Sequence, residues 1–342
     1  MTDKMRIQEH FSLKQHNTFG IAVNSRYFVE ITSVAFLQEL LSDPLLKDLP
    51  KLILGEGSNV LFTQDFPGLV IKMSLKGIEK TMEDDQHAWI TAGAGENWHQ
   101  LVLYCIKNNL SGIENLSLIP GTVGAAPLQN IGAYGVELKQ VFDQLTAVRL
   151  SDGALRVFDL PECQFGYRES VFKTEFRNQY AIVSVRLRLN KKPIFCLDYG
   201  AIKETLAAMQ VKELSIQAIS DAVIQIRQQK LPDPKKIGNA GSFFKSPVLS
   251  KQAFSLIYQQ YPHVPHFSDG NEYYKIPAGW FIEQCGWKGR RVGDTGVHEH
   301  HALVLVNYGN GSGQEIKRLA EDIQASVKDK FAVDLIPEVN II

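Results

Sequence analysis

Three things are scarce in this 342-residue sequence: excess charge of one sign, long apolar runs and cysteine. Its 36 Lys and Arg residues nearly balance its 37 Asp and Glu residues, and no run of like charge occurs. Because nucleic-acid-binding domains usually carry a basic patch, we expect no nucleic-acid partner. No stretch approaches the roughly 20 apolar residues of a membrane span, and the first residues, MTDKMRIQEHF, lack the apolar core of a signal peptide. We therefore expect a cytoplasmic protein that does not enter the membrane.

The four cysteines are too scattered for a disulfide framework. Cys105, Cys163, Cys196 and Cys285 lie far apart among apolar or aromatic neighbours, a pattern typical of buried thiols. Three histidines gather in VHEHHALVL (297–305), but no distant set of ligands at metal-site spacing accompanies them. We expect neither disulfides nor a metal site.

The periodicity of apolar residues predicts a mixed α and β chain. Its length exceeds that of one ordinary domain, and 44% of its residues are hydrophobic. Strand patterns dominate up to about residue 190, together with helices at 33–43 and 96–110 and a hairpin at 145–160. Helices dominate from residue 215, with strands at 302–307 and 332–342. The stretch KLPDPKKIGNAG (230–241) is predicted to be a loop too polar for the core.

Two glycine-rich stretches offer bare backbone. GEGSN (55–59) suits an anion-binding turn or an ordinary hairpin turn. IPGTVGAAPLQNIGAYG (119–135) has no charged side chain and suits either a planar or phosphorylated ligand or a close crossing of backbone. The Lys-Ser or Lys-Thr ending of a phosphate-binding P-loop is missing, so a P-loop phosphotransferase is excluded.

Three further residues could carry chemistry. Arg168 in GYRES lies beside an aromatic residue, where it could neutralise a carboxylate or enolate or simply face solvent. Ser242 in GNAGSFFKSP has no nucleophile-elbow spacing, so it fits a proton donor or a backbone-capping serine. Glu338 interrupts the apolar segment IPEVNII, and a carboxylate in such a strand must pair, cap or act.

Taken in order, these stretches resemble the motifs of one enzyme family, the UDP-N-acetylenolpyruvoylglucosamine reductases of peptidoglycan-precursor synthesis. The motifs are HNTFG (16–20), GEGSN, the 119–135 stretch, GYRES, KLPDPK, GNAGSFFKSP and PEV (337–339), and they span nearly the whole chain. The resemblance implies an α+β fold. Two FAD-binding subdomains of the vanillyl-alcohol-oxidase/PCMH type would occupy residues 1–72 and 73–215. A smaller α+β substrate-binding domain would occupy residues 216–342, and its final strand would carry Glu338 back to the active site.

The resemblance also implies the reaction. Non-covalent FAD would take a hydride from NADPH and pass it to C3 of the enolpyruvyl ether of a UDP-sugar. Arg168 and Glu338 match the pair that stabilises charge on the intermediate, and Ser242 matches the serine that protonates C2. The backbone amides of GEGSN and the 119–135 stretch would cradle the flavin's diphosphate and ribityl chain without a lysine.

Further positions are carried over from the family's motifs. The expected cofactor-binding residues are Gly55, Glu56, Gly57, Ser58, Asn59, Pro120, Gly121, Thr122, Gly124, Ala125, Gly132 and Arg227. The expected substrate-binding residues are Tyr134, Tyr199, Lys230 and Lys275, with Tyr199 on the substrate-capping loop of one of the two family types. Ser246 stands where asparagine is common. Glu56 stands where glycine is common, and a side chain pointing away from the turn would be harmless there.

Two other interpretations remain open at this level. The chain could be another FAD oxidoreductase of the same superfamily, which would often hold its flavin covalently through a histidine. It could also be a nucleotide-sugar-binding relative without turnover, although Arg168, Ser242 and Glu338 are all present. We expect a monomer that binds only small molecules.

Overall fold

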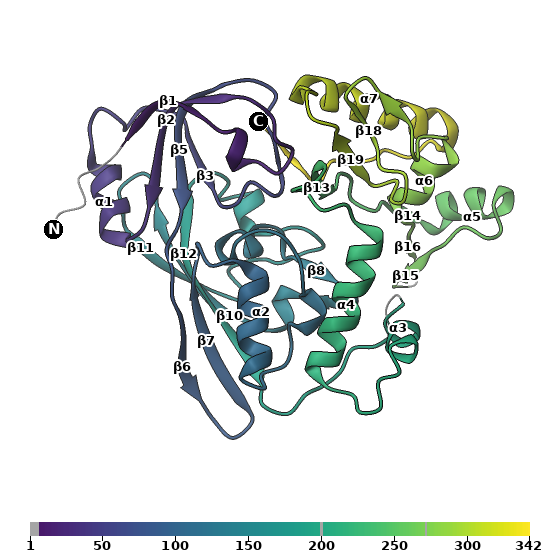
Figure 1. Cartoon of the computed structure of the whole chain (residues 1–342), viewed down its shortest axis with the longest axis horizontal. Coiled ribbons are helices and arrows are strands. Elements are labelled where there is room, and N and C mark those ends of the chain that lie inside the picture. The colour runs from purple at the N-terminus through teal and green to yellow at the C-terminus, as the bar shows by residue number, and fades with distance from the viewer. Residues whose placement is uncertain (1–6, 199–200, 271) are drawn as a thin grey trace. The chain divides into compact units, whose positions relative to one another are not determined.

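The computed structural model describes residues 7–198, 201–270 and 272–342 (Figure 1). The chain divides into two compact units. Unit 1 comprises Met1–Phe11, Ser25–Glu56 and Phe66–Gln229, and unit 2 comprises Ser12–Asn24, Gly57–Asp65 and Lys230–Ile342. The expected three-part division stays a prediction. In the structure, residue 72 lies inside a strand, and the helix expected to open the third part is grouped with unit 1.

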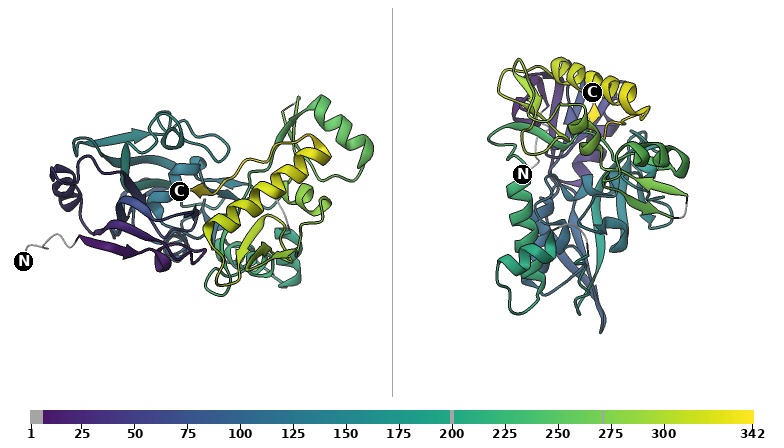
Figure 2. Two further views of the ribbon diagram at one scale, coloured as in Figure 1. Left: turned by 90° about the horizontal axis from the view of Figure 1, so that it is seen from above. Right: turned by 90° about the vertical axis from the view of Figure 1, so that its right-hand side faces the viewer.

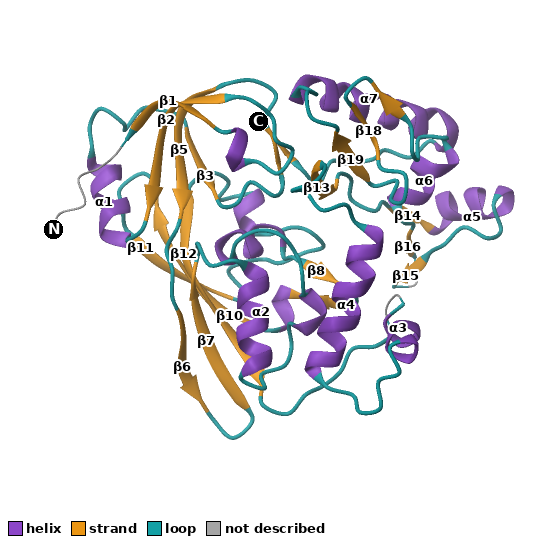
Figure 3. Ribbon diagram, viewed as in Figure 1, coloured by secondary structure: helices purple, strands orange, loops and turns teal. Residues whose placement is uncertain are grey.

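Unit 1 contains two larger sheets (Figure 3). The first has the order β1-β2-β5-β3, in which β2 and β3 both run parallel to β5. The second has the order β11-β10-β12-β7-β6 and is antiparallel. The strands are β1 (Gln8–Ser12), β2 (Asn24–Ile31), β3 (Lys51–Leu54), β5 (Phe66–Met73), β6 (Ile78–Glu83), β7 (His87–Gly93), β8 (Gly132–Ala133), β9 (Val136–Glu137), β10 (Phe142–Arg149), β11 (Leu155–Asp159) and β12 (Tyr180–Asn190).

The helices of unit 1, apart from the one that begins at Ile202, each follow a residue whose side chain caps them. The helices are α1 (Val34–Ser42), α2 (Trp98–Lys107), α3 (Ile202–Ala208) and α4 (Ile216–Lys230). Ser33 Oγ accepts the N–H of Phe36 at the start of α1, and Asn97 Oδ1 accepts the N–H of Gln100 at the start of α2. The helices predicted at 33–43 and 96–110 are confirmed to within a few residues, and α4 opens the helix-rich part that we predicted from residue 215.

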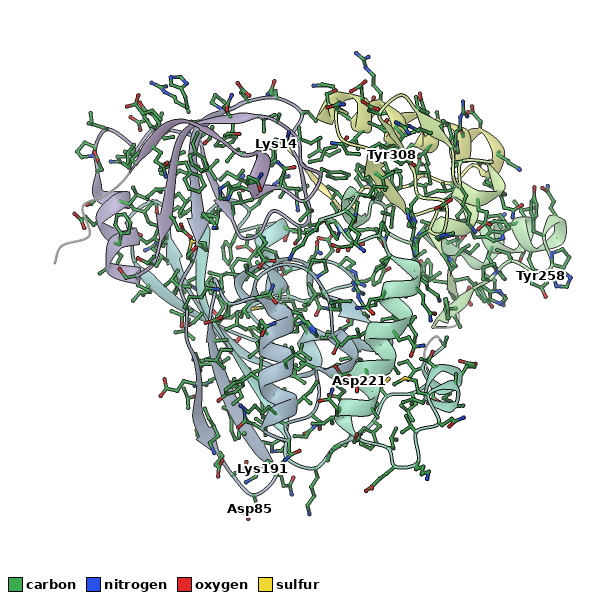
Figure 4. All side chains as sticks on the ribbon, viewed as in Figure 1. Lys14, Asp85, Lys191, Asp221, Tyr258 and Tyr308 are labelled. Carbon is green, nitrogen blue, oxygen red and sulfur yellow. The ribbon has the colours of Figure 1, made fainter. Side chains whose placement is uncertain are left out.

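Two hydrophobic clusters cover the sheets of unit 1, and a further cluster joins α3 to α4. The apolar face of α2, which includes the buried residues Trp98, Leu101 and Cys105, belongs to the cluster that covers one face of the five-stranded sheet. The other cluster joins α1 and the first sheet to Val148 and Val183 on the opposite face of the second sheet. Figure 4 shows Lys191 near the β6–β7 turn that carries Asp85, where the N–H of Lys191 donates to the carbonyl of Gln86 at 2.8 Å.

Unit 2 is built around a four-stranded antiparallel sheet of order β13-β19-β18-β17. Its long helix α7 packs on β18 and β19 and is the yellow helix of Figure 2. Ser312 and Glu315 form a capping box at the start of α7. The elements are β4 (Val60–Leu61), β13 (Gly238–Ser242), β14 (Val248–Ser250), α5 (Lys251–Gln260), β15 (Phe267–Asp269), β16 (Tyr273–Lys275), α6 (Ala278–Gln284), β17 (Arg291–Val292), β18 (Thr295–Val297), β19 (Val304–Asn307), α7 (Gly313–Phe331) and β20 (Asn340–Ile341).

The structure corrects two expectations in unit 2. The predicted strand at 332–342 is reduced to β20, because Pro337 lacks an N–H and the segment changes its partners around it. The predicted loop 230–241 ends in strand β13, whose Asn239 is only 2% exposed. The Asn239 amide can be buried because it donates to the carbonyls of Pro232 and Ile237 and accepts the N–H of Gly241.

Candidate active site

In unit 1 the 119–135 stretch runs beside the segment that joins β7 to α2. The N–H groups of Val123 and Gly124 donate to the carbonyls of Glu96 and Ala94, and the carbonyl of Gly121 accepts the N–H of Trp98. A Cβ on Gly124 would lie 2.5 Å from the Cβ of Ala94. The close crossing of backbone that we considered for this stretch is therefore present, and Gly124 is required by it.

This crossing uses amides that we expected to face a ligand. The N–H groups of Gly121, Val123, Gly124 and Ala125 all donate within the protein. Any contact between these residues and a cofactor would therefore use other atoms. Pro120 and Ala125 are exposed, and Gly132 is half-buried, so these positions are accessible.

Glu56 has a role that the sequence did not suggest. Its carboxylate accepts the Nδ2–H of Asn97 at 2.9 Å and the N–H of Gly121 at 3.2 Å. The Glu56 side chain therefore does not point away from the turn, as we considered. It connects GEGSN to the 119–135 stretch within unit 1 by these two hydrogen bonds. The neighbouring Gly55 is equally constrained, since a Cβ there would lie 2.5 Å from Thr122 Oγ1.

The second half of GEGSN, Gly57 to Asn59, belongs to unit 2. Gly57 has φ +65°, and a Cβ on it would lie 2.1 Å from the carbonyl oxygen of His16. The N–H groups of Gly57 and Ser58 make no hydrogen bond with any described part of the chain. Two consecutive free amides at a left-handed glycine form the kind of concavity that binds anions.

Arg168 lies on a tight turn that is docked on the end of the 119–135 stretch. The backbones of Gly166 and Glu169 exchange hydrogen bonds across this turn. Arg168 itself has φ +56°, and its Nη2 donates to the carbonyl of Gly132 at 2.5 Å. The side chain is half-buried, so the surface arginine that we considered as the alternative is not what the structure contains.

Tyr134, an expected substrate residue, is held at both ends. It has φ +50°, and its carbonyl accepts the Nδ2–H of the buried Asn115 at 2.9 Å. Its hydroxyl interacts electrostatically with the guanidinium of Arg227, which lies on α4 and which we expected to contact the cofactor. The Nε–H of Arg227 is buried and has no partner among the described residues. A donor left unsatisfied in this way is consistent with a ligand that is not part of the chain.

His99 on α2 was missed by the sequence reasoning. Its Nδ1 accepts the N–H of Leu118 at 3.0 Å, and Leu118 has φ +58° directly before the 119–135 stretch. Burial, together with the nearby charge of Arg227, lowers the pKa of His99, which favours the neutral ring that can accept this bond. No motif marks such a histidine, because its partner is a backbone amide 19 residues away.

Ser242 and Glu338 lie close together in the backbone of unit 2. The N–H of Glu338 donates to the carbonyl of Phe243 at 2.8 Å, and the N–H of Phe243 donates to the carbonyl of Leu303 at 2.8 Å. Phe243 and Phe244 are buried, whereas Ser242 and Glu338 are half-buried. The carbonyl of Glu338 accepts the Nδ2–H of Asn59 at 3.2 Å, so GEGSN also supports the segment that carries this carboxylate.

The remaining expected residues are placed less informatively. Lys230 is exposed at the end of α4, and Lys275 on β16 is half-buried with its ammonium 6.0 Å from the ring centre of Phe267. Tyr199 lies outside the described residues. Ser246, where asparagine is common, accepts the N–H of Ala278, the first residue of α6, at 3.4 Å.

No group of His, Cys, Asp or Glu within the described ranges could hold a metal ion. All four cysteines are free thiols; Cys105 and Cys163 are buried, while Cys196 and Cys285 are half-buried. Burial raises the pKa of both Cys105 and Cys163 to about 12. No helix in the described part of the chain is long and apolar enough to cross a bilayer.

Family models match two parts of the chain. Residues 25–159 match an FAD binding domain, and residues 233–342 match the C-terminal domain of UDP-N-acetylenolpyruvoylglucosamine reductase. Among solved structures, the reductase of that name from Thermus caldophilus is similar with a TM-score of 0.68 and 25% identity, over 98% of this chain and 99% of that one. The fold is also similar to that of p-cresol methylhydroxylase, with a TM-score of 0.51 at 13% identity. The predicted α+β fold of the PCMH type is thereby confirmed.

Relatives of known name match the chain from end to end. The UDP-N-acetylenolpyruvoylglucosamine reductase of Amoebophilus asiaticus is 55% identical over 338 residues, which is 99% of this chain and 100% of that protein. The enzyme of the same name from Flavobacterium johnsoniae is 47% identical over 339 residues, again 99% of this chain and all of that protein. The chain therefore belongs to the UDP-N-acetylenolpyruvoylglucosamine reductase family.

Proposed function

We propose that the protein reduces UDP-N-acetylenolpyruvoylglucosamine to UDP-N-acetylmuramic acid with NADPH and FAD, a step in peptidoglycan-precursor synthesis. Full-length membership of the reductase family supports the activity. The observation that carries the proposal is the set of three chemical groups that the reaction needs. Arg168 lies on a docked turn of unit 1, and Ser242 and Glu338 lie on paired backbone segments of unit 2.

The residues present fit a bound FAD. The free amides of Gly57 and Ser58 suit a diphosphate, because consecutive N–H groups in a turn neutralise negative charge without a lysine. The buried Nε–H of Arg227 would donate to a polar atom of the flavin ring. When bound, FAD supplies hydride transfer between NADPH and C3 of the enolpyruvyl group. The other cofactor residues carried over from the family stay part of this proposal.

Arg168 and Glu338 would stabilise the charge that develops when C3 accepts a hydride. Electron density then moves to C2 and its carboxylate, and a fixed guanidinium lowers the energy of that enolate-like species. The docked turn supplies the fixed geometry, because Arg168 is held by its own bond to Gly132. Glu338 would help to stabilise charge on the same carboxylate of the substrate.

Ser242 would give the proton that ends the reaction at C2. A serine hydroxyl is a weak acid, so it can serve only a strongly basic carbon, and neighbouring groups must then restore its proton. Tyr134, Tyr199, Lys230 and Lys275 would contact the nucleotide-sugar, since phenol and ammonium groups supply stacking area and charge. We propose that the enzyme acts in the cytoplasm, because both substrates are nucleotides made and used inside cells. We propose that it acts as a monomer.

Purification and a two-substrate assay test this function. The purified protein should be yellow, release its flavin on acid precipitation, and oxidise NADPH beyond one equivalent per flavin only when enolpyruvyl-UDP-N-acetylglucosamine is present. Flavin retained on the precipitated protein would favour a covalent oxidase of the same superfamily. A protein that binds the UDP-sugar and FAD but never oxidises NADPH would be the binding relative without turnover.

A further inference from the structure

Asn130 is a fully buried residue at the end of the 3-10 turn Val123–Gln129 in unit 1, and its side chain faces the turn of Arg168. Its Oδ1 accepts the N–H of Lys139 at 3.0 Å. Its Nδ2 donates to the carbonyl of Gly166 and to the carboxylate of Glu137, each at 3.0 Å. The carbonyl oxygen and both N–H bonds of the amide are thus engaged, which fixes the orientation of the side chain.

The bond to Gly166 supports a turn whose backbone is strained at Arg168. Arg168 has φ +56°, and a non-glycine residue in the left-handed region costs roughly 1–2 kcal/mol. The bonds that close the turn are 3.1 Å from Gly166 N–H to Glu169 and 3.4 Å in return, and the latter is long. The shorter contact from Asn130 to the same Gly166 carbonyl therefore adds the support that the turn itself lacks.

Two other contacts dock this loop on the same short segment. Ser170 Oγ donates to the carbonyl of Leu128 at 2.7 Å, and Arg168 Nη2 donates to the carbonyl of Gly132. Asn130 lies midway between Leu128 and Gly132. The loop is therefore attached at three alternate positions along residues 128–132, and the central attachment is made by the Asn130 side chain.

We infer that Asn130 is a positioning residue for Arg168, a role that rests on the proposed function of Arg168 in stabilising charge on the substrate. Asn130 acts through the Gly166 carbonyl, which fixes the turn and so the direction in which the guanidinium leaves it. Misplacement of a reacting group by about 1 Å can cost on the order of 100-fold in rate. The loss should fall on the step that uses Arg168.

Two substitutions separate this role from simple folding. Asn130→Asp keeps the shape and the acceptor for Lys139, but it removes the donor to Gly166 and places a carboxylate oxygen against that carbonyl and against Glu137. Asn130→Gly adopts the observed φ of +42° without strain and removes all three bonds. Ser220→Ala is the matched control, because it removes a buried hydrogen bond to Ser117 in unit 1 without touching the Arg168 turn.

The first measurement follows the flavin absorbance in the two half-reactions of the holoenzyme, by stopped flow without oxygen. Both Asn130 variants should be reduced by NADPH at rates within about twofold of the wild type. Their reoxidation by enolpyruvyl-UDP-N-acetylglucosamine should be slower by about 10- to 100-fold. Ser220→Ala should change neither rate, even where its melting temperature falls as far as theirs.

The second measurement uses binding alone, by titration calorimetry. UDP-N-acetylmuramic acid carries the carboxylate that Arg168 would meet, whereas UDP-N-acetylglucosamine does not. Asn130→Asp should weaken binding of UDP-N-acetylmuramic acid by about tenfold, which is the effect expected from losing one charge-assisted hydrogen bond. Binding of UDP-N-acetylglucosamine should be unchanged. Equal weakening of both ligands would overturn the inference.

A double variant tests whether the effect passes through Arg168. Adding Asn130→Asp to Arg168→Ala should slow reoxidation no further, because no guanidinium remains to be positioned. A further tenfold loss would mean that Asn130 acts by another route and would overturn the inference. The inference is also overturned if Asn130→Asp is reoxidised at the wild-type rate while Arg168→Ala is reoxidised slowly. If Arg168→Ala itself reoxidises normally, the proposed role of Arg168 fails, and the inference fails with it.

Discussion

The two units hold their functional side chains by different kinds of bond. In unit 1, Arg168 depends on side chains that reach backbone carbonyls, above all Asn130 and its own guanidinium. In unit 2, Ser242 and Glu338 depend mainly on bonds between backbone groups, such as Glu338 N–H to Phe243 and Phe243 N–H to Leu303, with one side-chain bond from Asn59 to the Glu338 carbonyl. A side-chain bond can be removed by one substitution, whereas a backbone bond cannot. Substituting a residue that supports a functional side chain should therefore affect the chemistry more in unit 1 than in unit 2.

The backbone conformation follows the same division. Arg168 and Tyr134 both have positive φ, which residues other than glycine rarely adopt. Near each of them a buried asparagine donates a hydrogen bond to the local backbone. Ser242 lies at the end of strand β13, and the positive φ beside it, +71°, falls on Gly241, which adopts it without strain. The residues of unit 1 are thus set by strained turns, and those of unit 2 are set by sheet geometry.

The largest effect expected from this comparison comes from a direct change in unit 2. Ser242→Ala should leave reduction of the flavin by NADPH near the wild-type rate, because the backbone of β13 is unchanged. Reoxidation by the enolpyruvyl substrate should fall by about 10²- to 10⁴-fold, since the proton donor for C2 is lost. Single-turnover absorbance of the flavin measures both steps. Fast reoxidation by this variant would remove Ser242 from the mechanism.

A smaller effect, on stability, is expected when a glycine is replaced by alanine in one unit and, in a separate variant, in the other. Gly124→Ala in unit 1 places a Cβ 2.5 Å from that of Ala94, so the 119–135 stretch must shift. We expect the free energy of unfolding to fall by about 1–3 kcal/mol and the FAD to dissociate more readily. Denaturant titration and flavin retention on gel filtration would measure these two losses.

Gly279→Ala in helix α6 of unit 2 is the control. The nearest atom to its new Cβ would be Leu303 Cγ at 3.4 Å, close to ordinary contact. Replacing a helical glycine by alanine then stabilises by about 0.5–1 kcal/mol. If Gly124→Ala were as well tolerated as Gly279→Ala, the close crossing in unit 1 would not limit this stretch.

The sequence alone predicted the helices and most strands well, because their apolar residues repeat with the period of each structure. Capping residues such as Ser33 and Asn97 also stand where helices begin. The segment 332–342 was predicted poorly, since its apolar residues face two partners in turn on either side of Pro337. Periodicity reports which face is buried, but it does not report a change of partner.

The candidate site was predicted as a set of residues but not as an arrangement. The motifs marked Arg168, Ser242 and Glu338, because each is an uncommon polar residue in its local pattern. Nothing in the sequence pointed to His99 or Asn130, which act on backbone groups 19 and 36 residues away. A residue that supports another through the backbone leaves no local signature in the sequence, so only the three-dimensional structure reveals it.

The smallest expected effect concerns the buried carboxylate of Glu114 in unit 1, which is 3% exposed. Burial raises the pKa of this group, although the N–H of Gly112 donates to it at 2.6 Å and opposes that shift. Because its pKa is higher in the folded than in the unfolded state, the stability that it contributes is complete below its unfolded pKa. That contribution is lost as the pH rises through the folded pKa.

Glu114→Gln keeps an acceptor for Gly112 and removes the charge. We therefore expect it to stabilise the protein by about 1 kcal/mol at pH 8 and to have much less effect at pH 4, where the carboxyl is mostly protonated in both states. Urea titrations at the two pH values measure the difference. The control is Glu162→Gln on the surface of unit 1. The N–H of Asp159 and the Arg156 guanidinium lower the pKa of Glu162. Its contribution to stability therefore has the opposite pH dependence and is lost as the pH falls. Stabilisation by both substitutions at pH 8 would point to a general charge effect and not to the burial of Glu114.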